Sequence, residues 1–144
     1  MNPRAYHELA ERLVSSPAPA PADCRAAISR AYYAAFNVGA ELLRAAGFPV
    51  GRGAGAHGEV RHCLANCGDA DVALAVSRLG DLHTDRNRAD YHMERADVER
   101  QVKARAAVHI AAEIIRTFDA AFGGSSRGQL QLAIQAWRRA NGYP

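Results

Sequence analysis

One short segment of the sequence brings together side chains that could act on a phosphate group. Arg86, Asn87 and Arg88 are followed closely by Tyr91 and His92. Arginine offers a permanent, planar donor that can hold a phosphodiester through two hydrogen bonds. Histidine can accept and release a proton near neutral pH. Together the two residue types are suited to chemistry on a phosphodiester.

A structural explanation of the same segment stays open. Arg86 could pair with Asp90, one helical turn later, for roughly a few tenths of a kcal/mol, with His92 in a loop. On one continuous helix, Arg86 and His92 would point about 120° apart. For the two to act together, either the helix ends between them or two chains contribute, as in a symmetric dimer.

The position of Arg86 on its helix is unusual. An apolar stripe with helical spacing precedes it, formed by Val72, Val76, Leu79 and Leu82. At about 100° per residue, Arg86 lies within roughly 20° of Leu79 and hence on the apolar side. Because charged groups are seldom placed on a buried face without a partner, the functional prediction rests on Arg86.

The elements that must position this segment are helical. The chain has 144 residues, of which 49% are hydrophobic and 23% charged, as expected for one globular domain. Alanine, which has the lowest cost in a helix, occurs 31 times, and the glycines and prolines are clustered. The composition favours an all-α fold, and the sequence contains no convincing strand pattern and no internal repeat.

Helix boundaries follow from capping residues at the starts and from glycine and proline at the ends. The first expected helix is Ala5–Val14, which follows Asn2-Pro3 and is ended by the break Ser15–Ala22. A long helix then begins at the cap Asp23 and ends at Gly47-Phe48-Pro49. The remaining expected helices are Glu59–Asn66, one capped by Asp69 or Asp71, one from Ala96-Asp97 to Gly123–Ser126, and Gln129–Ala140. We expect a single domain over residues 1–144, with its core in residues 23–122 and a C-terminal appendage at 125–144.

Three segments of the chain occur in an informative order. They are Ser29–Phe36 with the sequence SRAYYAAF, His57-Gly58 at the head of a helix, and Arg86–Tyr91. In this order they closely resemble the HEPN superfamily (higher eukaryotes and prokaryotes nucleotide-binding), and within it a group of small bacterial proteins. The most diagnostic piece is an arginine and a histidine separated by four to six residues, which Arg86 and His92 match. The resemblance runs from about Asp23 to Phe122.

This resemblance implies both a fold and an activity. The fold would be an up-and-down bundle of four to five helices, followed here by a short C-terminal helix, that forms a homodimer with both motifs in one cleft. The activity would be that of a metal-independent endoribonuclease, often the toxin of a pair whose antitoxin is a small nucleotidyltransferase. The RNA 2′-hydroxyl would attack the neighbouring phosphate. His92 would transfer the proton, Arg86 would hold the phosphate and stabilise its charge, and Asn87 would orient one of them.

Further candidates for contacts with the RNA are Arg88, Arg30 and His83. Arg30 either points into the cleft or, as we favour, pairs with an acid such as Asp90. His83 lies about 40° from Leu79 and can flank Arg86, although a packed histidine or a dimer contact explains this position as well.

Two other functions stay open. The chain could be a non-catalytic subunit that binds a nucleotidyltransferase or an RNA, since many members of the family lack the histidine, or it could be a nucleotide-binding regulator. In members that are modified by their partner, a tyrosine lies two residues after the motif histidine, and here that residue is Glu94. The sequence therefore does not predict control by tyrosine modification.

Other candidate sites favour structural explanations. Cys63 and Cys67, near His57 and His62, share a helix face, but structural zinc sites use tighter cysteine pairs and a second cluster. We therefore expect no metal and no cofactor. The loop Gly51–Gly55 follows a helix and lacks the Lys-Ser/Thr of a phosphate loop. Helical spacing predicts core positions for the aromatic residues Tyr32, Tyr33 and Phe36.

Charge and cysteine content bear on the surroundings of the protein. The net charge of +3 and the pI near 9.0 suit an anionic partner such as RNA, but the surplus is small. The three cysteines cannot all pair within one chain, and no signal segment opens the sequence, so we expect a reducing cytoplasm. No apolar run approaches the roughly 20 residues of a membrane span, so no membrane partner is expected.

Overall fold

Six α-helices and one 3₁₀ turn make up the chain in the structure, a computed structural model that describes residues 1–144. The elements are α1 (Arg4–Val14), α2 (Pro21–Ala45), α3 (Ala56–Ala65), α4 (Ala70–Tyr91), the 3₁₀ turn Ala96–Glu99, α5 (Gln101–Gly123) and α6 (Arg127–Ala140). There is no strand, so the predicted all-α bundle is confirmed. None of the helices combines the length and the apolar character needed to cross a membrane.

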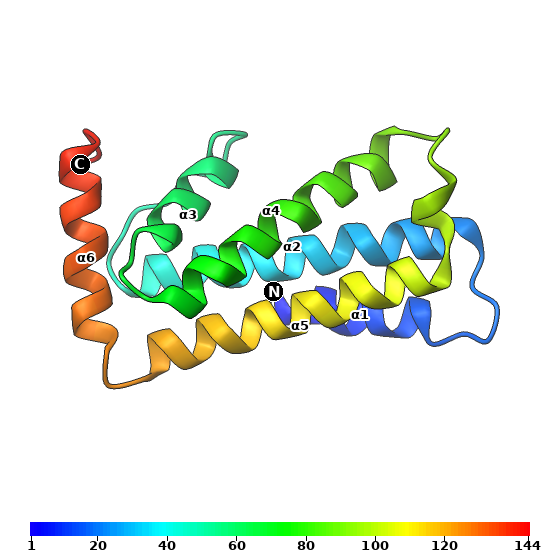
Figure 1. The fold of residues 1–144 in the computed structure, drawn as a ribbon, viewed down its shortest axis with the longest axis horizontal. Coiled ribbons are helices and arrows are strands. Elements are labelled where there is room, and N and C mark those ends of the chain that lie inside the picture. Colours follow the sequence, from blue (N-terminus) through cyan, green and yellow to red (C-terminus); the bar gives the residue numbers. More distant parts are fainter.

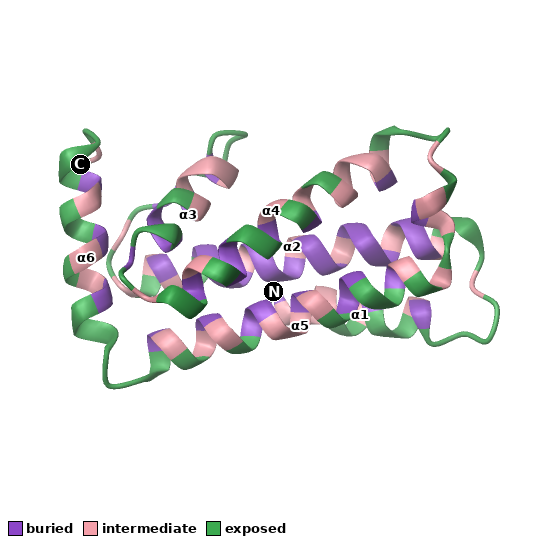
Figure 2. Cartoon of the chain, in the orientation of Figure 1, coloured by how far each residue is buried: buried purple, intermediate pink, exposed green.

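Helix α2 lies at the centre of the bundle and packs against α1, α4 and α5 (Figure 1). It is buried along most of its length, whereas the outer helices alternate buried and exposed residues (Figure 2). Its largest fully buried side chains, Ile28, Tyr32 and Leu43, share one core with Leu79 of α4 and Phe118 of α5. The burial of each such side chain contributes about 1.5–3 kcal/mol, so α2 is the element against which the others are positioned.

Helix α2 begins three residues earlier than the sequence predicts, at Pro21 with Ala20 as its cap. Pro21 occupies its first position, where proline suits the helix because no backbone N–H is needed there. Asp23, predicted to be the cap, lies inside the first turn. Its carboxylate accepts a hydrogen bond from the backbone N–H of Ala20 at 3.0 Å, so it still stabilises the start of the helix.

Three other helices also start at unexpected residues. Helices α3 and α6 begin earlier than predicted, at Ala56 and Arg127, and α5 begins later, at Gln101. Before α5, the buried Val98 holds the 3₁₀ turn against α2, and the extended backbone of Arg100 separates the turn from the helix. Apolar spacing over four residues does not distinguish such a turn from the first turn of an α-helix.

Local capping and glycine signals are confirmed at the other boundaries. The side chain of Asn2 accepts from the backbone N–H of Arg4 at 3.0 Å. Asp69 caps α4 by accepting from two backbone N–H groups of its first turn, at 2.9 and 3.0 Å. After α2, Gly47 takes a φ of +95°, a left-handed conformation that ends helices and that glycine adopts without strain.

Helix α6 crosses one end of the bundle and packs against α3 and α5 (Figure 1). It buries Leu130 and Ile134, and Trp137 packs at the edge of the core. Arg138 is also buried, and it donates a hydrogen bond to Oε1 of Glu59 on α3 at 2.9 Å. Removing one partner of a buried ion pair leaves an uncompensated charge, so this pair fastens α6 to α3.

Candidate functional site

Arg86 lies in the last third of α4, and its side chain is only 12% exposed. Its guanidinium donates to the hydroxyl of Tyr33 on α2 and, at 2.8 Å, to Oδ1 of Asn87. Its Nε lies 3.1 Å from Oδ2 of Asp90, close enough for an ion pair. The predicted placement of Arg86 on the apolar side of its helix is confirmed, and so is the pairing with Asp90.

Aromatic rings surround the guanidinium of Arg86. Its Cζ lies 4.9 Å from the ring centre of Tyr33 and 5.5 Å from that of Tyr91, within the range of cation–π attraction. Burial disfavours the charged form, but the hydrogen bond to Tyr33 and the carboxylate of Asp90 outweigh burial and raise the pKa of Arg86. Arg86 is therefore a permanent cation in a largely dry setting, where charge-assisted hydrogen bonds to a phosphate are strong.

His92 lies at the end of the same helix and faces solvent. Helix α4 ends at Tyr91, and His92 follows as its C-cap with a non-helical backbone (φ −112°, ψ 83°), so the helix does end between Arg86 and His92. The His92 side chain is 54% exposed, and its Nδ1 lies 3.1 Å from Oε1 of Glu94. No hydrogen bond or ion pair joins it to Arg86. The predicted helix end between Arg86 and His92 is therefore present, but the two side chains make no contact within one chain, and a contribution from two chains stays a prediction.

Asn87 and Arg88, the two residues after Arg86, face different ways. Asn87 contacts the guanidinium of Arg86, the position from which it can orient that group. Arg88 pairs with Asp85 at 3.4 Å, and the same carboxylate binds Lys103 of α5 at 2.9 Å. The structure therefore brings Asn87 to Arg86 but holds Arg88 on the side of α4 that faces α5.

Arg30 does not form the predicted pair with Asp90, so this prediction is wrong. Ser29, one residue earlier, donates its hydroxyl to Oδ2 of Asp90 at 3.1 Å. One residue turns a side chain by about 100° around a helix, so Arg30 points elsewhere. Its guanidinium lies 5.4 Å from the ring centre of Tyr6 on α1 and 5.8 Å from that of Tyr33.

Beside Arg86, three helices contribute rings to a stacked cluster, formed by Tyr32, Phe36, His57 and His83. The rings of His57 and His83 are nearly parallel, with 5.1 Å between centres and 9° between planes. Tyr32 stacks on His83 at 4.9 Å, and its hydroxyl lies 2.6 Å from Nδ1 of His57. Phe36 covers His57 at 4.3 Å. The packed position expected for His83 is confirmed, whereas its contact with His57 had no signal in the sequence spacing.

Burial lowers the pKa of both His57 and His83. The positive charges of Arg86 and Arg61 act in the same direction. Burial also raises the pKa of Tyr32, so its hydroxyl stays protonated. At neutral pH both imidazole rings are therefore uncharged.

Acidification is expected to destabilise the protein between about pH 7 and pH 5. Unfolded histidines have a pKa of 6.5, and folding lowers the pKa of His57 and His83 below that value. The unfolded state thus binds more protons than the folded state, so the free energy of unfolding decreases as the pH is lowered. Thermal melts should show a shallower pH dependence for His83→Phe, which keeps a ring but does not titrate. A variant slope equal to that of the wild type would contradict this explanation.

Sequence reasoning missed Arg25 of α2, which is 8% exposed. It pairs with Glu99 at 2.8 Å. It also donates to backbone carbonyls at and after the end of α4, at 2.9 to 3.3 Å, namely those of Arg88, Ala89, His92, Met93 and Arg95. Arg25 therefore sets the course of the backbone that carries His92. A signal existed, because Arg25 is three residues before the core residue Ile28 and so shares its face.

The cysteines and the other histidines do not form a metal cluster. No three side chains of His, Cys, Asp or Glu come together in a group that could hold a metal ion. Burial raises the pKa of Cys63 and Cys67, both of which are free thiols. Metals bind the thiolate form, so these two residues are parts of the core. His62 lies beside Trp137, with 6.0 Å between ring centres.

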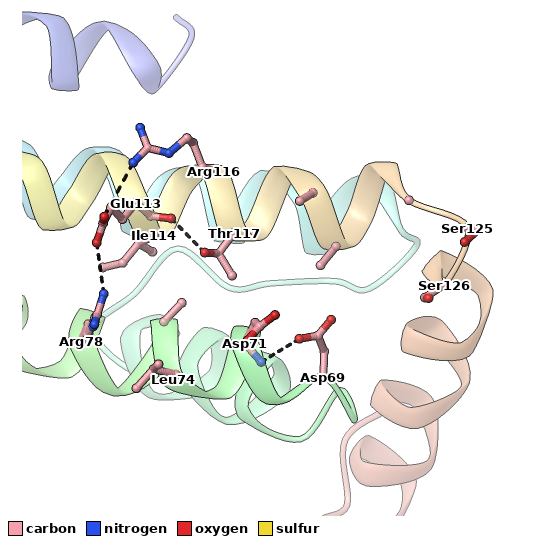
Figure 3. Close-up of a pocket in the computed structure, with 14 residues that line it drawn as sticks. Asp69, Asp71, Leu74, Arg78, Glu113, Ile114, Arg116, Thr117, Ser125 and Ser126 are labelled. Atoms are coloured by element: carbon pink, nitrogen blue, oxygen red, sulfur yellow. Dashed lines mark hydrogen bonds and ion pairs between the residues drawn. The ribbon is translucent and has the colours of Figure 1, made fainter.

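A surface groove of about 500 Å³ lies between α4, α5 and the start of α6 (Figure 3). The ion pair of Arg78 and Glu113, at 3.1 Å, joins its two sides. None of the residues predicted to act on RNA lines it. Acidic Asp69 and Asp71 offset the charge of Arg116 in its lining, so the groove does not concentrate the positive charge that a phosphate requires.

Comparison with protein-family models, with curated proteins and with solved structures finds no match. No relative therefore supplies a role for Arg86, His92 or the stacked cluster.

Proposed function

We propose that the protein is a metal-independent endoribonuclease of the HEPN type that acts as a homodimer. The observation that carries the proposal is the setting of Arg86. It is a nearly buried cation of α4, held by Tyr33 and Asn87, and the exposed His92 directly follows the end of that helix. A permanent phosphate-binding cation and an exposed proton carrier are the groups that RNA cleavage by its own 2′-hydroxyl requires.

A second copy of the chain completes the proposed site. Arg86 and His92 of one chain bind other partners and not each other, whereas a twofold axis can set each arginine opposite the histidine of the other chain. Tyr91 and Met93 flank His92 and are 69% and 64% exposed. Such exposed apolar side chains support a contact surface between copies at this end of α4.

The proposed reaction is an internal transfer at phosphorus. The 2′-oxygen forms a bond to phosphorus while the bond to the 5′-oxygen breaks, which leaves a 2′,3′-cyclic phosphate and a 5′-hydroxyl. His92 moves the proton of the attacking hydroxyl toward the leaving oxygen. Arg86 stabilises the charge on the five-coordinate phosphorus, and Asn87 orients Arg86. We assign weaker RNA contacts to Arg88, Arg30 and His83.

We propose that this activity serves as the toxin of a toxin–antitoxin pair, with a nucleotidyltransferase-type antitoxin as partner, on the basis of the family resemblance. A non-catalytic subunit that binds RNA or such a partner is the second candidate. The observation that favours it is the contact of His92 with Glu94, together with the lack of contact between His92 and Arg86 in one chain.

Cleavage of RNA in excess EDTA tests the proposal. The purified protein should cut a labelled RNA in the chelator and leave 2′,3′-cyclic phosphate ends, identified by mass spectrometry. The matched control is the same RNA with a single 2′-deoxy residue at the cut position, which should resist because it lacks the nucleophile. Cleavage that depends on a divalent ion would contradict the proposal, and RNA that is bound but left intact would favour the non-catalytic subunit.

A further inference from the structure

Arg61, on α3, is a guanidinium without a partner in the protein. Its Nε is buried and forms no hydrogen bond, and none of its other nitrogens takes part in a hydrogen bond or an ion pair. The acidic residue of α3, Glu59, is already paired with Arg138 at 2.9 Å. Because an unpaired, partly buried charge is destabilising, Arg61 is suited to an anionic ligand.

Arg61 lies next to the stacked histidines, on a line of residues that we call the α3–α4 seam: His57, Arg61, Gly80 and His83. Arg61 follows His57 by one helical turn, so both occupy one face of α3. Its guanidinium crosses α4 at Gly80, where a Cβ would lie only 3.2 Å from Nη1. The absence of a side chain at Gly80 thus lets the cation reach α4.

The imidazole nitrogens of the seam are also largely free. Tyr32 engages Nδ1 of His57, whereas Nε2 of His57 and both nitrogens of His83 have no partner. Each uncharged ring retains one N–H that can donate. The ion pairs that histidines form in this protein involve other residues, namely His7, His92 and His109. The seam therefore offers donors and positive charge without a carboxylate of its own.

Arg86 adjoins the other end of the seam, three residues after His83 on α4. Its guanidinium lies 6.0 Å from the ring centre of Tyr32, the residue that bonds His57. A surface hollow of about 290 Å³ opens beside Arg61 between α3 and α4. Of the seam, Arg61 and Gly80 line this hollow, so it gives space for a ligand at the Arg61 end. From there, donor and cationic groups follow through the histidine pair to Arg86.

We propose that the α3–α4 seam binds a phosphate of the RNA strand, adjacent to the phosphate held at Arg86. The inference rests on the proposed function, which supplies the strand. Arg61 provides the charge and the paired donors that match a phosphodiester, and His57 and His83 add N–H donors. A strand whose reacting phosphate lies at Arg86 then brings its next phosphate to the seam, and the enzyme holds two successive phosphates.

The salt dependence of binding tests the seam separately from cleavage. The probe is a fluorescent 2′-O-methyl oligoribonucleotide, which lacks the attacking hydroxyl and stays intact. The logarithm of the association constant falls as the logarithm of the salt concentration rises. Arg61→Gln is expected to make this slope shallower by about 0.7, the value for one single-strand phosphate contact. Arg61→Lys should recover most of the slope. Arg139→Gln removes the same charge from an exposed position on α6 and should leave the slope unchanged.

A second measurement requires no variant. In the wild type, the same oligoribonucleotide should shift the imidazole NMR signals of His57 and His83. Absent shifts, or an unchanged slope in folded Arg61→Gln, would overturn the proposal. The protein could show the shallower slope in Arg61→Gln and the shifted imidazole signals but leave natural RNA uncut. That outcome would support the seam as a phosphate site and would reject only the endoribonuclease function.

Discussion

Replacement of His92 with alanine is expected to slow RNA cleavage by about 10²–10⁴-fold, the range for loss of a general acid–base group. The fold should persist, because the side chain is 54% exposed and its one partner is the exposed Glu94. Initial rates on labelled RNA, the melting temperature and the mass in solution measure these effects together. His109→Ala is the matched control, since His109 is 69% exposed on α5 and pairs with Glu113. Unchanged cleavage in His92→Ala would reject His92 as the proton carrier.

A mixture of His92→Ala with a second variant, Arg86→Ala, tests whether two chains build the site. An Arg86→Ala chain retains His92, and a His92→Ala chain retains Arg86. In a mixed dimer, one of the two composite sites regains both groups, so random pairing of equal amounts should restore about a quarter of the wild-type rate. A mixture as inactive as its components would show that Arg86 and His92 do not meet across a dimer.

Replacement of Arg25 with alanine is expected to cost about 3–5 kcal/mol of folding free energy, as the loss of one partner from a buried ion pair does. Its side chain is 10% exposed, and Glu99 would lose its counter-charge. The backbone carbonyls at the end of α4 would lose their donor as well. The backbone around His92 should therefore loosen, and cleavage should decline together with stability.

Urea unfolding measures this loss, with Arg78→Ala as the control. Arg78 forms an exposed ion pair with Glu113, with side chains 47% and 39% exposed, and pairs of this kind contribute about 0–1 kcal/mol. Hydrogen exchange of the backbone amides of residues 92–95 should be faster in Arg25→Ala than in Arg78→Ala. Equal stability losses in the two variants would contradict the role assigned to Arg25.

Helix boundaries were predictable where the signal is local. Asn2, Asp69 and Gly47 act through hydrogen bonds or backbone conformation within a few residues, and all three behave as predicted. The start of α5 was not predictable in this way. It depends on the burial of Val98 against α2, a contact between segments far apart in the sequence.

In the candidate site, too, features set by local spacing were predictable and contacts between distant segments were not. Arg86 was predictable because helical periodicity reveals a charged residue at the end of an apolar stripe. Arg25 obeys the same rule, but its partners lie 63 to 74 residues further along the chain. A pattern can therefore indicate that such a cation needs partners without identifying them.

The amino-acid order alone determines the helical class, most helix ends and the exceptional position of Arg86, because backbone hydrogen bonding and periodicity act over a few residues. The packing of the helices determines the rest. It stacks His57 on His83, turns Ser29 rather than Arg30 toward Asp90, and leaves Arg61 unpaired across Gly80. A rotation of about 100° separates neighbouring residues on a helix, so such contacts depend on how whole helices are rotated against one another, which no local pattern specifies.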